Sequence, residues 1–456
     1  MSSPYQGTWK YGGVEFIDDI IKIEVVATND RATKKFFKEF KERLKESLRQ
    51  IDILITTQAF KSYELEFTCA SMQPLGGLRL VKQFEPPPFL QGIGKSPIRS
   101  ITDRAKPGDI SFGLGEPDLP TPEVIRRAAI RVITEEQNGY TLQAGLPALR
   151  ELITGDYPHM KLTTDEVIIT AGSQEALYRA LMTLIGEGDE VMLPDPGFVA
   201  YPTIVRMAGG VPVYYRLPAA GDFAFDADEF RSRVSARTKA VVCVSPSNPT
   251  GRTLSAADLE AIAEALRNTD VFVISDEIYR DLYYTAARPA SISTFHKRTI
   301  VLSGLSKSMS MTGWRLGWMC GEEAVIRSAL ILHGYVTTCA STVSQKAALA
   351  AWTREGESAR ADIRKTFHER RDYLLSLISR ELGLRAVAPD GAFYTMVDTS
   401  SYGSSMEVAE KLLNHGVITI PGAAFGDQSE GFLRVSFCAD NDKLAEGVRR
   451  MKSALN

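Results

Sequence analysis

Apolar residues occur along the chain from about residue 110 in short runs, each followed by an amphipathic stretch. The runs are rich in β-branched residues and too short for helices, so they predict buried strands. The stretches between them place apolar residues three or four positions apart, as at Leu177, Leu181 and Leu184, which predicts helices that pack on a sheet. This alternation indicates an α/β fold with a mostly parallel central sheet. The predicted strands span residues 166–170, 190–193, 240–244, 271–274 and 299–302.

The first 75 residues follow a separate pattern. Two β-branched runs, at 20–26 and 51–57, flank a stretch that begins with the cap Thr28-Asn29-Asp30 and has helical apolar spacing. Residues 1–75 are therefore interpreted as a small β-α-β unit with an accessory role, either a docking or regulatory module or a plain extension. Three consecutive prolines, 86–88, exclude a helix and mark the boundary that follows. The apolar positions of the helical stretch are Phe37, Phe40, Leu44 and Leu48.

Composition limits the class of protein. The 456 residues are 44% hydrophobic and 24% charged, as in an ordinary soluble protein, and allow about three domains. A net charge of -3 gives no indication of nucleic acid or of an anionic membrane surface. No apolar run approaches membrane-spanning length, and the first residues show no signal peptide. Five scattered cysteines without CxxC spacing argue against a disulfide framework or a zinc site, so we expect a cytoplasmic protein without a metal.

Polar or conformationally special residues follow each predicted strand. Because ligands of open α/β sheets bind outside the carboxyl ends of the strands, we expect these residues to converge on one crevice. Five strand ends that each carry polar or conformationally special residues are stronger evidence for one ligand site than any single motif. The segments are Gly172-Ser173-Gln174, Asp195-Pro196-Gly197-Phe198, Ser245-Pro246-Ser247-Asn248, Asp276-Glu277-Ile278-Tyr279 and Ser306-Lys307.

The string GLSKSMSMTGWRLG, residues 304–317, sets Lys307 eight residues ahead of Arg315. A lysine just past an apolar run, among small residues, suits an amine that must reach a carbonyl, and an arginine suits a phosphate. One residue to form an imine and one to hold a phosphate are what pyridoxal phosphate needs. Taken singly, each residue is better explained as a surface lysine or a salt-bridged arginine; the fourteen-residue string together changes that balance.

The motifs together resemble the class I/II aminotransferase family of fold-type I pyridoxal-phosphate enzymes. The resemblance extends from about residue 80 to the C-terminus, and the order and spacing of the motifs are those of the family. Beside the lysine string they are GLGEPDLPTP (113–122), NGYTLQAGLPALRE (138–151), AGSQEAL (171–177), PDPGFVAYP (194–202), SPSNPTG (245–251), SDEIY (275–279), PGAAFG (421–426) and FLRVSF (432–437).

The resemblance implies a large domain with a mostly parallel sheet and a small α+β domain. We expect residues 76–125 to form the N-terminal part of the small domain, residues 126–340 the large cofactor-binding domain, and residues 341–456 the C-terminal small domain. It also implies a homodimer that transfers an amino group between an amino acid and a 2-oxo acid, with pyridoxal 5'-phosphate as cofactor.

Four residues are expected to act on the cofactor ring. The resemblance implies that Lys307 forms the Schiff base and then moves a proton between the substrate Cα and cofactor C4′. Asp276 is expected to face the pyridine nitrogen and keep it protonated. Asn248 and Tyr279 are expected to hydrogen-bond the ring hydroxyl. We also expect a cis bond between Asn248 and Pro249, a segment that reads equally as an ordinary turn.

Five residues are expected to form the cofactor's phosphate site. Gly172, Ser173 and Gln174 open a helix whose N-terminus exposes backbone N–H groups. Arg315 and Ser306 complete the set. Many relatives carry a serine where this chain has Gly304, so one hydroxyl contact is expected to be missing or supplied by Ser303 or Ser306.

Two aromatic residues complete the cofactor-binding set. Phe198 is expected to stack on the ring, where relatives often carry tyrosine or tryptophan, and its alternative is a plain core phenylalanine. Tyr140 is expected to reach the phosphate of the neighbouring subunit.

The substrate carboxylate is expected to bind Arg434 as a bidentate pair, beside Asn248 and the close backbone of Gly115. A second cation that would select dicarboxylates is not identifiable by motif, and Arg280 is only a neighbour of Tyr279 in sequence. Aspartate, alanine, aromatic and diaminopimelate-type donors all remain open. The alternatives to transamination are a carbon–sulfur β-lyase, another enzyme of the same fold type, or a catalytically dead protein.

Overall fold

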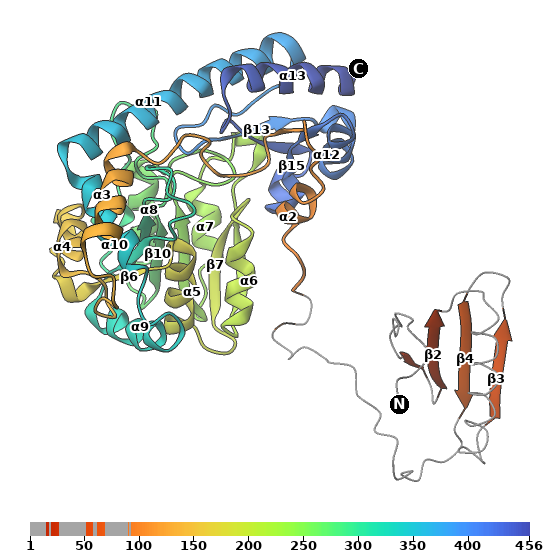
Figure 1. The fold of residues 1–456 in the computed structure, drawn as a ribbon, viewed down its shortest axis with the longest axis horizontal. Coiled ribbons are helices and arrows are strands. Elements are labelled where there is room, and N and C mark those ends of the chain that lie inside the picture. The colour runs from red at the N-terminus through yellow and green to blue at the C-terminus, as the bar shows by residue number, and fades with distance from the viewer. Residues whose placement is uncertain (1–14, 18–19, 27–51, 58–61, 69–89, 91–92) are drawn as a thin grey trace. The chain divides into compact units, whose positions relative to one another are not determined.

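The computed structural model describes residues 15–17, 20–26, 52–57, 62–68, 90 and 93–456. It divides into two compact units, Met1–Gln91 and Gly92–Asn456, which are described separately (Figure 1). None of the helices in the described ranges is long and apolar enough to cross a membrane.

The first unit contains a four-stranded sheet in the order β1-β2-β4-β3, with every neighbouring pair antiparallel. Two of these strands, β2 (Ile20–Val26) and β3 (Asp52–Thr57), confirm the two predicted runs. The other two, β1 (Glu15–Ile17) and β4 (Ser62–Thr68), were not predicted, although the SYELEFT sequence of β4 alternates polar and apolar residues as a strand does. The predicted helix at 37–48, its cap and the prolines 86–88 lie outside the described residues.

The second unit is built on a seven-stranded sheet in the order β6-β12-β11-β10-β9-β7-β8 (Figure 1). All five predicted strands are confirmed, and β12 is the strand that runs antiparallel to its neighbours. The sheet is therefore mostly parallel, as expected. The strands are β6 (Val167–Thr170), β7 (Glu190–Asp195), β8 (Val211–Arg216), β9 (Thr238–Val244), β10 (Phe272–Asp276), β11 (Thr299–Gly304) and β12 (Gly317–Cys320).

Helices cover both faces of this sheet, which explains why its strands are apolar at nearly every position. Val242 and Ile274 pack into a core with α5 (Ser173–Leu184) and α9 (Glu323–Val336). Their neighbours Val241 and Val273 face the opposite core, with α7 and α8. The remaining helices around the sheet are α3 (Glu123–Glu135), α4 (Pro147–Gly155), α6 (Ala200–Met207), α7 (Ala227–Arg233), α8 (Ala256–Ala265) and α10 (Thr342–Ala348).

A smaller α+β part follows, with the antiparallel sheet β13-β16-β15 and a separate pair β14-β5. Because β5 (Ile110–Ser111) pairs with β14 (Val417–Ile418), a segment from before the large sheet joins the C-terminal part. The predicted boundaries at 125–126 and 340–341 stay predictions. The other elements are α2 (Pro97–Thr102), β13 (Tyr394–Asp398), β15 (Ile420–Pro421), β16 (Phe432–Ser436), α11 (Arg354–Leu377), α12 (Ser405–Asn414) and α13 (Asn441–Leu455).

Candidate active site

The carboxyl edge of the large sheet gathers the predicted residues. Asp276 is the last residue of β10, Lys307 follows β11, and Asn248 follows β9, the neighbour of β10. Arg434 of β16 reaches this edge from the small sheet, because its guanidinium bonds to Asn248. Residues far apart in the sequence thus meet at one place, as the pattern of strand ends predicts.

Lys307 lies deep in this edge. Its Nζ donates a hydrogen bond to the carbonyl of Gly115 at 2.7 Å and lies 5.8 Å from the ring centre of Phe393. Burial lowers the pKa of the Lys307 amine from 10.5 to about 8. About a tenth of the amine is therefore uncharged at pH 7, far more than for an ordinary lysine, and the uncharged form is the one that attacks a carbonyl.

Asp276 is held by two hydrogen bonds. Tyr201 donates from its hydroxyl to Oδ2 at 2.8 Å, and the backbone N–H of Ile278 donates to Oδ1 at 3.3 Å. Burial raises the pKa of the Asp276 carboxyl, opposed by the hydrogen bond from Tyr201 and by the charge of Lys307. A cationic partner would stabilise the ionised form of this buried carboxyl, as a protonated ring nitrogen does.

Tyr279 and Tyr394 share a hydrogen bond between their hydroxyls at 2.9 Å. Their rings pack edge to face with centres 5.8 Å apart, and Tyr279 also packs against Phe393. Burial raises the pKa of both phenols, so each stays protonated and able to donate a hydrogen bond.

Arg434 is 1% exposed, yet its partners are neutral. Nη1 donates to Oδ1 of Asn248 at 2.9 Å, Nη2 donates to the carbonyl of Gly113, and Nε has no partner among the described residues. The guanidinium lies over the rings of Tyr394 and Phe425, 4.4 and 4.8 Å from their centres. A buried cation without an anionic partner is suited to bind one.

The N-terminus of α5 and Arg315 lie against each other. Gly172 precedes the helix with φ 87°, and a Cβ there would lie 2.6 Å from Nη2 of Arg315. Arg315 donates to the carbonyls of Thr312 and Ala171, at 2.8 and 3.3 Å. Its partners are also neutral, and the first N–H groups of α5, at Ser173 and Gln174, lie beside it. The arrangement is typical of a phosphate site.

The serines near Lys307 differ in whether their hydroxyls are free to bind a phosphate. Ser303 donates to the carbonyl of Glu277 at 3.1 Å, so its hydroxyl is already used within the protein and Ser306 is the better candidate to replace the missing phosphate hydroxyl. Ser306 is buried beside the lysine. Gly304 is explained by packing, because it pairs with Gly317 of β12 and a Cβ there would lie 2.8 Å from the carbonyl of Leu316.

Phe198, Tyr140 and Gly115 complete the predicted set. Phe198 packs edge to face on Tyr201, with ring centres 5.6 Å apart, and so lies next to the aromatic residue that holds Asp276. The backbone of Gly115 is in tight contact with Tyr394, since a Cβ at 115 would lie 1.8 Å from its hydroxyl. Tyr140 is 87% exposed and is not brought to the other residues within one chain.

Two residues of the site were missed from the sequence, Tyr201 and Tyr394. Tyr201 lies in the PDPGFVAYP motif, where its position three residues after Phe198 on a helix gives some signal. Tyr394 occurs outside the recognised motifs. The expected cis bond between Asn248 and Pro249 is present.

Arg280 follows the carboxyl end of β10, but its guanidinium is already occupied. Its guanidinium lies 4.3 Å from the ring centre of Tyr157, and its Nε lies 3.7 Å from a carboxylate oxygen of Glu277. Nη2 also donates to the carbonyl of Asp156 at 3.4 Å, so Arg280 offers no free cation to the candidate site.

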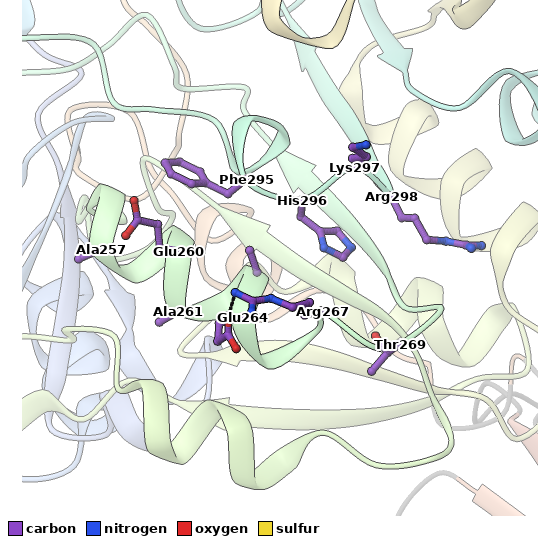
Figure 2. Close-up of a pocket in the computed structure, with 11 residues that line it drawn as sticks. Ala257, Glu260, Ala261, Glu264, Arg267, Thr269, Phe295, His296, Lys297 and Arg298 are labelled. Carbon is purple, nitrogen blue, oxygen red and sulfur yellow. Dashed lines mark ion pairs between the residues drawn. The ribbon is translucent and has the colours of Figure 1, made fainter.

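A hollow of about 760 Å³ lies at the opposite edge of the sheet, between α8 and the segment before β11 (Figure 2). Its two arginines are paired, Arg267 with Glu264 and Arg298 with Asp270 at 3.1 Å, and Lys297 also lines it. His296 bonds to the carbonyl of Val271, the residue before β10. The hollow is thus at the amino ends of β10 and β11, away from Lys307 and Asp276.

Comparison with known proteins identifies the family. The model of aminotransferase class I and II matches residues 107–451. This chain belongs to the class I and II aminotransferases. It is 38% identical over 367 residues to a probable aspartate/prephenate aminotransferase of Thermus aquaticus, covering 78% of this chain and 94% of that protein. It is 38% identical over 353 residues to a probable N-acetyl-LL-diaminopimelate aminotransferase of Bacillus subtilis, covering 75% and 88%.

Among solved structures, the chain is similar to the aspartate aminotransferase from Thermus thermophilus with maleate. The TM-score is 0.78 at 31% identity, over 82% of this chain and 100% of that one. The fold is therefore that of the fold-type I aminotransferases, and the protein is a pyridoxal-phosphate-dependent aminotransferase. The residues present fit this cofactor, because the edge offers an amine of lowered pKa, a buried carboxyl and an arginine at a bare helix N-terminus.

Proposed function

We propose that the carboxyl edge of the large sheet is the active site of this aminotransferase and that Lys307 carries the amino-group transfer from an amino acid to a 2-oxo acid. The observation that supports this most is the buried Lys307 amine, with its pKa lowered to about 8, at the same edge as Arg434. The amine is neutral often enough to attack and to carry a proton, and the arginine is free to bind an acid.

Bound pyridoxal phosphate supplies an electron sink for the negative charge that develops at the substrate Cα. In this proposal Asp276 keeps the pyridine nitrogen protonated, and the hydroxyl of Tyr201 orients the carboxylate that does so. Asn248 and the hydroxyl of Tyr279 hydrogen-bond the ring hydroxyl. Phe198 packs on the ring from the side of Tyr201.

Lys307 then moves the proton at the substrate Cα. The amine leaves its bond to the Gly115 carbonyl when it reaches the reacting carbon, and burial keeps its proton affinity low enough for it to accept and return a proton near neutral pH.

Arg434 binds the substrate α-carboxylate, held in place by Asn248, Gly113 and the ring of Tyr394. Arg315, Ser306 and the first N–H groups of α5, at Ser173 and Gln174, bind the cofactor phosphate, and Gly172 makes the turn that presents them. Gly115 lets the backbone approach the carboxylate, because no side chain fits between it and Tyr394.

The proposal includes a homodimer. Tyr140 is 87% exposed, and the nearby segment carries exposed Leu142, while α9 carries exposed Ile331 and Tyr335. The two segments adjoin, because a Cβ at Gly334 would lie 2.7 Å from the Gln143 side chain. An apolar surface of this kind suits a second copy, whose phosphate site Tyr140 then completes. A reducing, cytoplasmic location fits the unpaired Cys243, Cys320, Cys339 and Cys438.

The test is a half-reaction. Holoenzyme mixed with an amino donor and no acceptor should release one 2-oxo acid per site and then stop, and added 2-oxoglutarate or pyruvate should restore the aldehyde form. Continued release of pyruvate and ammonia without an acceptor identifies a lyase and contradicts the proposal. Aspartate, alanine, aromatic and diaminopimelate-type donors tested in this way identify the substrate.

A further inference from the structure

A buried polar group lies directly behind the phosphate site, around Glu175 in the first turn of α5. One oxygen of Glu175 accepts from the backbone N–H of Ala171 at 2.6 Å. The other accepts from Nδ1 of His333 at 2.8 Å, from the hydroxyl of Thr337 at 2.6 Å and from Arg179 at 3.1 Å. His333 is 0% and Arg179 1% exposed, so this carboxylate is fixed from several sides.

The Ala171 peptide is consequently held at both ends. Its N–H donates to Glu175, and its carbonyl accepts from Nη2 of Arg315 at 3.3 Å. The next residue is Gly172, whose φ of 87° turns the chain into α5. The direction of the first helical N–H groups and the position of Arg315 therefore both depend on this one peptide.

Glu175 does not act on a phosphate through its charge. A carboxylate in the first turn opposes a second anion at the helix N-terminus. Burial favours the neutral acid, but the bonds from His333, Thr337 and the Ala171 N–H lower the pKa of Glu175 to about 2, so it is ionised. Arg179 lies against the same oxygen and offsets the charge. What remains is the geometry that Glu175 imposes on Ala171.

We propose that Glu175 is a positioning residue for the cofactor phosphate: locked by His333 of α9 and by Thr337, which follows that helix, it fixes the Ala171 peptide and with it Arg315 and the N-terminus of α5. This inference rests on the proposed assignment of Arg315 and α5 to the phosphate. The ring-binding residues Asp276 and Tyr279 share none of the hydrogen bonds of Glu175.

The experiment compares three ligands of the apoenzyme: pyridoxal phosphate, inorganic phosphate and pyridoxal, which lacks the phosphate. Glu175→Gln keeps the shape of the side chain but has only one accepting oxygen. It can therefore accept either from the Ala171 N–H or from His333, Thr337 and Arg179, but not from both sides. We expect its affinity for pyridoxal phosphate and for inorganic phosphate to fall about 10- to 100-fold, with that for pyridoxal unchanged within about twofold. Thr337→Val removes one donor at similar volume. It should lower the affinities for pyridoxal phosphate and inorganic phosphate about three- to tenfold.

Two further variants distinguish failure of the positioning role from failure of the phosphate-site assignment. Glu407→Gln alters a carboxylate that also accepts a backbone N–H, from Ser404 at 3.0 Å, but in α12, and should change none of the affinities. Arg315→Ala should weaken both phosphate ligands. If Arg315→Ala weakens them and neither Glu175→Gln nor Thr337→Val does, or if pyridoxal is weakened equally, the positioning role is wrong. If Arg315→Ala has no effect, the phosphate site itself is wrong.

Discussion

The two edges of the large sheet differ in how their cations are partnered. At the amino edge, arginines pair with carboxylates: Arg298 with Asp270 before β11 and β10, and Arg237 with Glu190 at the start of β9 and β7. In the hollow at this edge Arg267 pairs with Glu264 in the same way (Figure 2).

At the carboxyl edge, the three cations of the candidate site bond to neutral groups. Lys307 donates to a carbonyl, Arg315 to two carbonyls, and Arg434 to an amide and a carbonyl. For Lys307 and Arg434, burial of a cation without an anion costs stability, and a ligand with anionic groups removes that cost, whereas Arg315 is exposed and open to a ligand. The difference indicates that the amino edge serves the fold, while the carboxyl edge is arranged to be completed by the phosphate and carboxylates of its ligands.

Loss of the Lys307 amine is expected to have the largest effect. Lys307→Ala removes both the cofactor attachment and the proton carrier, so turnover should fall by at least about 10,000-fold, and the yellow colour of the holoenzyme should be lost. Single-turnover release of 2-oxo acid measures this. Lys297→Ala, at the amino edge, is the matched control and should keep both; retained colour or turnover in Lys307→Ala contradicts the mechanism.

Removal of the Arg434 charge comes next. Arg434→Gln leaves the substrate carboxylate without its cation, and kcat/KM should fall about 100- to 1,000-fold, whereas cofactor affinity should stay within about twofold. Steady-state kinetics and cofactor titration separate the two effects. An equal loss of cofactor affinity would show that Arg434 serves the structure of the site and not the substrate.

A moderate effect is expected for Tyr201→Phe. The variant keeps the ring that packs on Phe198 but removes the hydrogen bond to Asp276. We expect kcat to fall about tenfold with KM little changed, because Asp276 is then less firmly oriented. The Tyr214→Phe variant alters an exposed phenol on β8 and serves as control; identical kinetics in both variants would remove Tyr201 from the site.

The smallest effect is expected at the amino edge. Arg298→Gln breaks a largely exposed ion pair with Asp270, which contributes about 0–1 kcal/mol to the free energy of unfolding. Thermal unfolding should shift slightly, and kcat/KM should not change. A large loss of activity in this variant would contradict the claim that the amino edge serves the fold and not the reaction.

The sequence predicts five strands of the sheet well, because they are buried on both faces and read as continuous apolar runs set off by helices. It misses β8, an edge strand that contains Pro212 and is partly exposed, and β12, which is short and follows the lysine loop without a helix between. Neither strand has the apolar, β-branched run followed by an amphipathic stretch that identified the five predicted strands.

The residues of the site also divide into those that the local sequence predicts and those that it does not. Residues directly after strand ends, such as Lys307, Asn248 and Asp276, are predictable because the parallel sheet brings them to one edge. The Tyr201–Asp276 hydrogen bond joins residues 75 positions apart, and the Glu175–His333 bond joins residues 158 apart. Such contacts depend on how helices pack on the sheet, which local sequence patterns do not specify.

The most direct test of the central claim is the titration of Lys307. An amine buried without an anionic partner has a lowered pKa, here about 8, whereas one paired with a carboxylate keeps its pKa near or above 10.5. The rate at which pyridoxal phosphate reconstitutes the apoenzyme should rise about tenfold per pH unit below 8, as the neutral amine increases, and level off above it. A rate that continues to rise toward pH 10.5 would contradict the account.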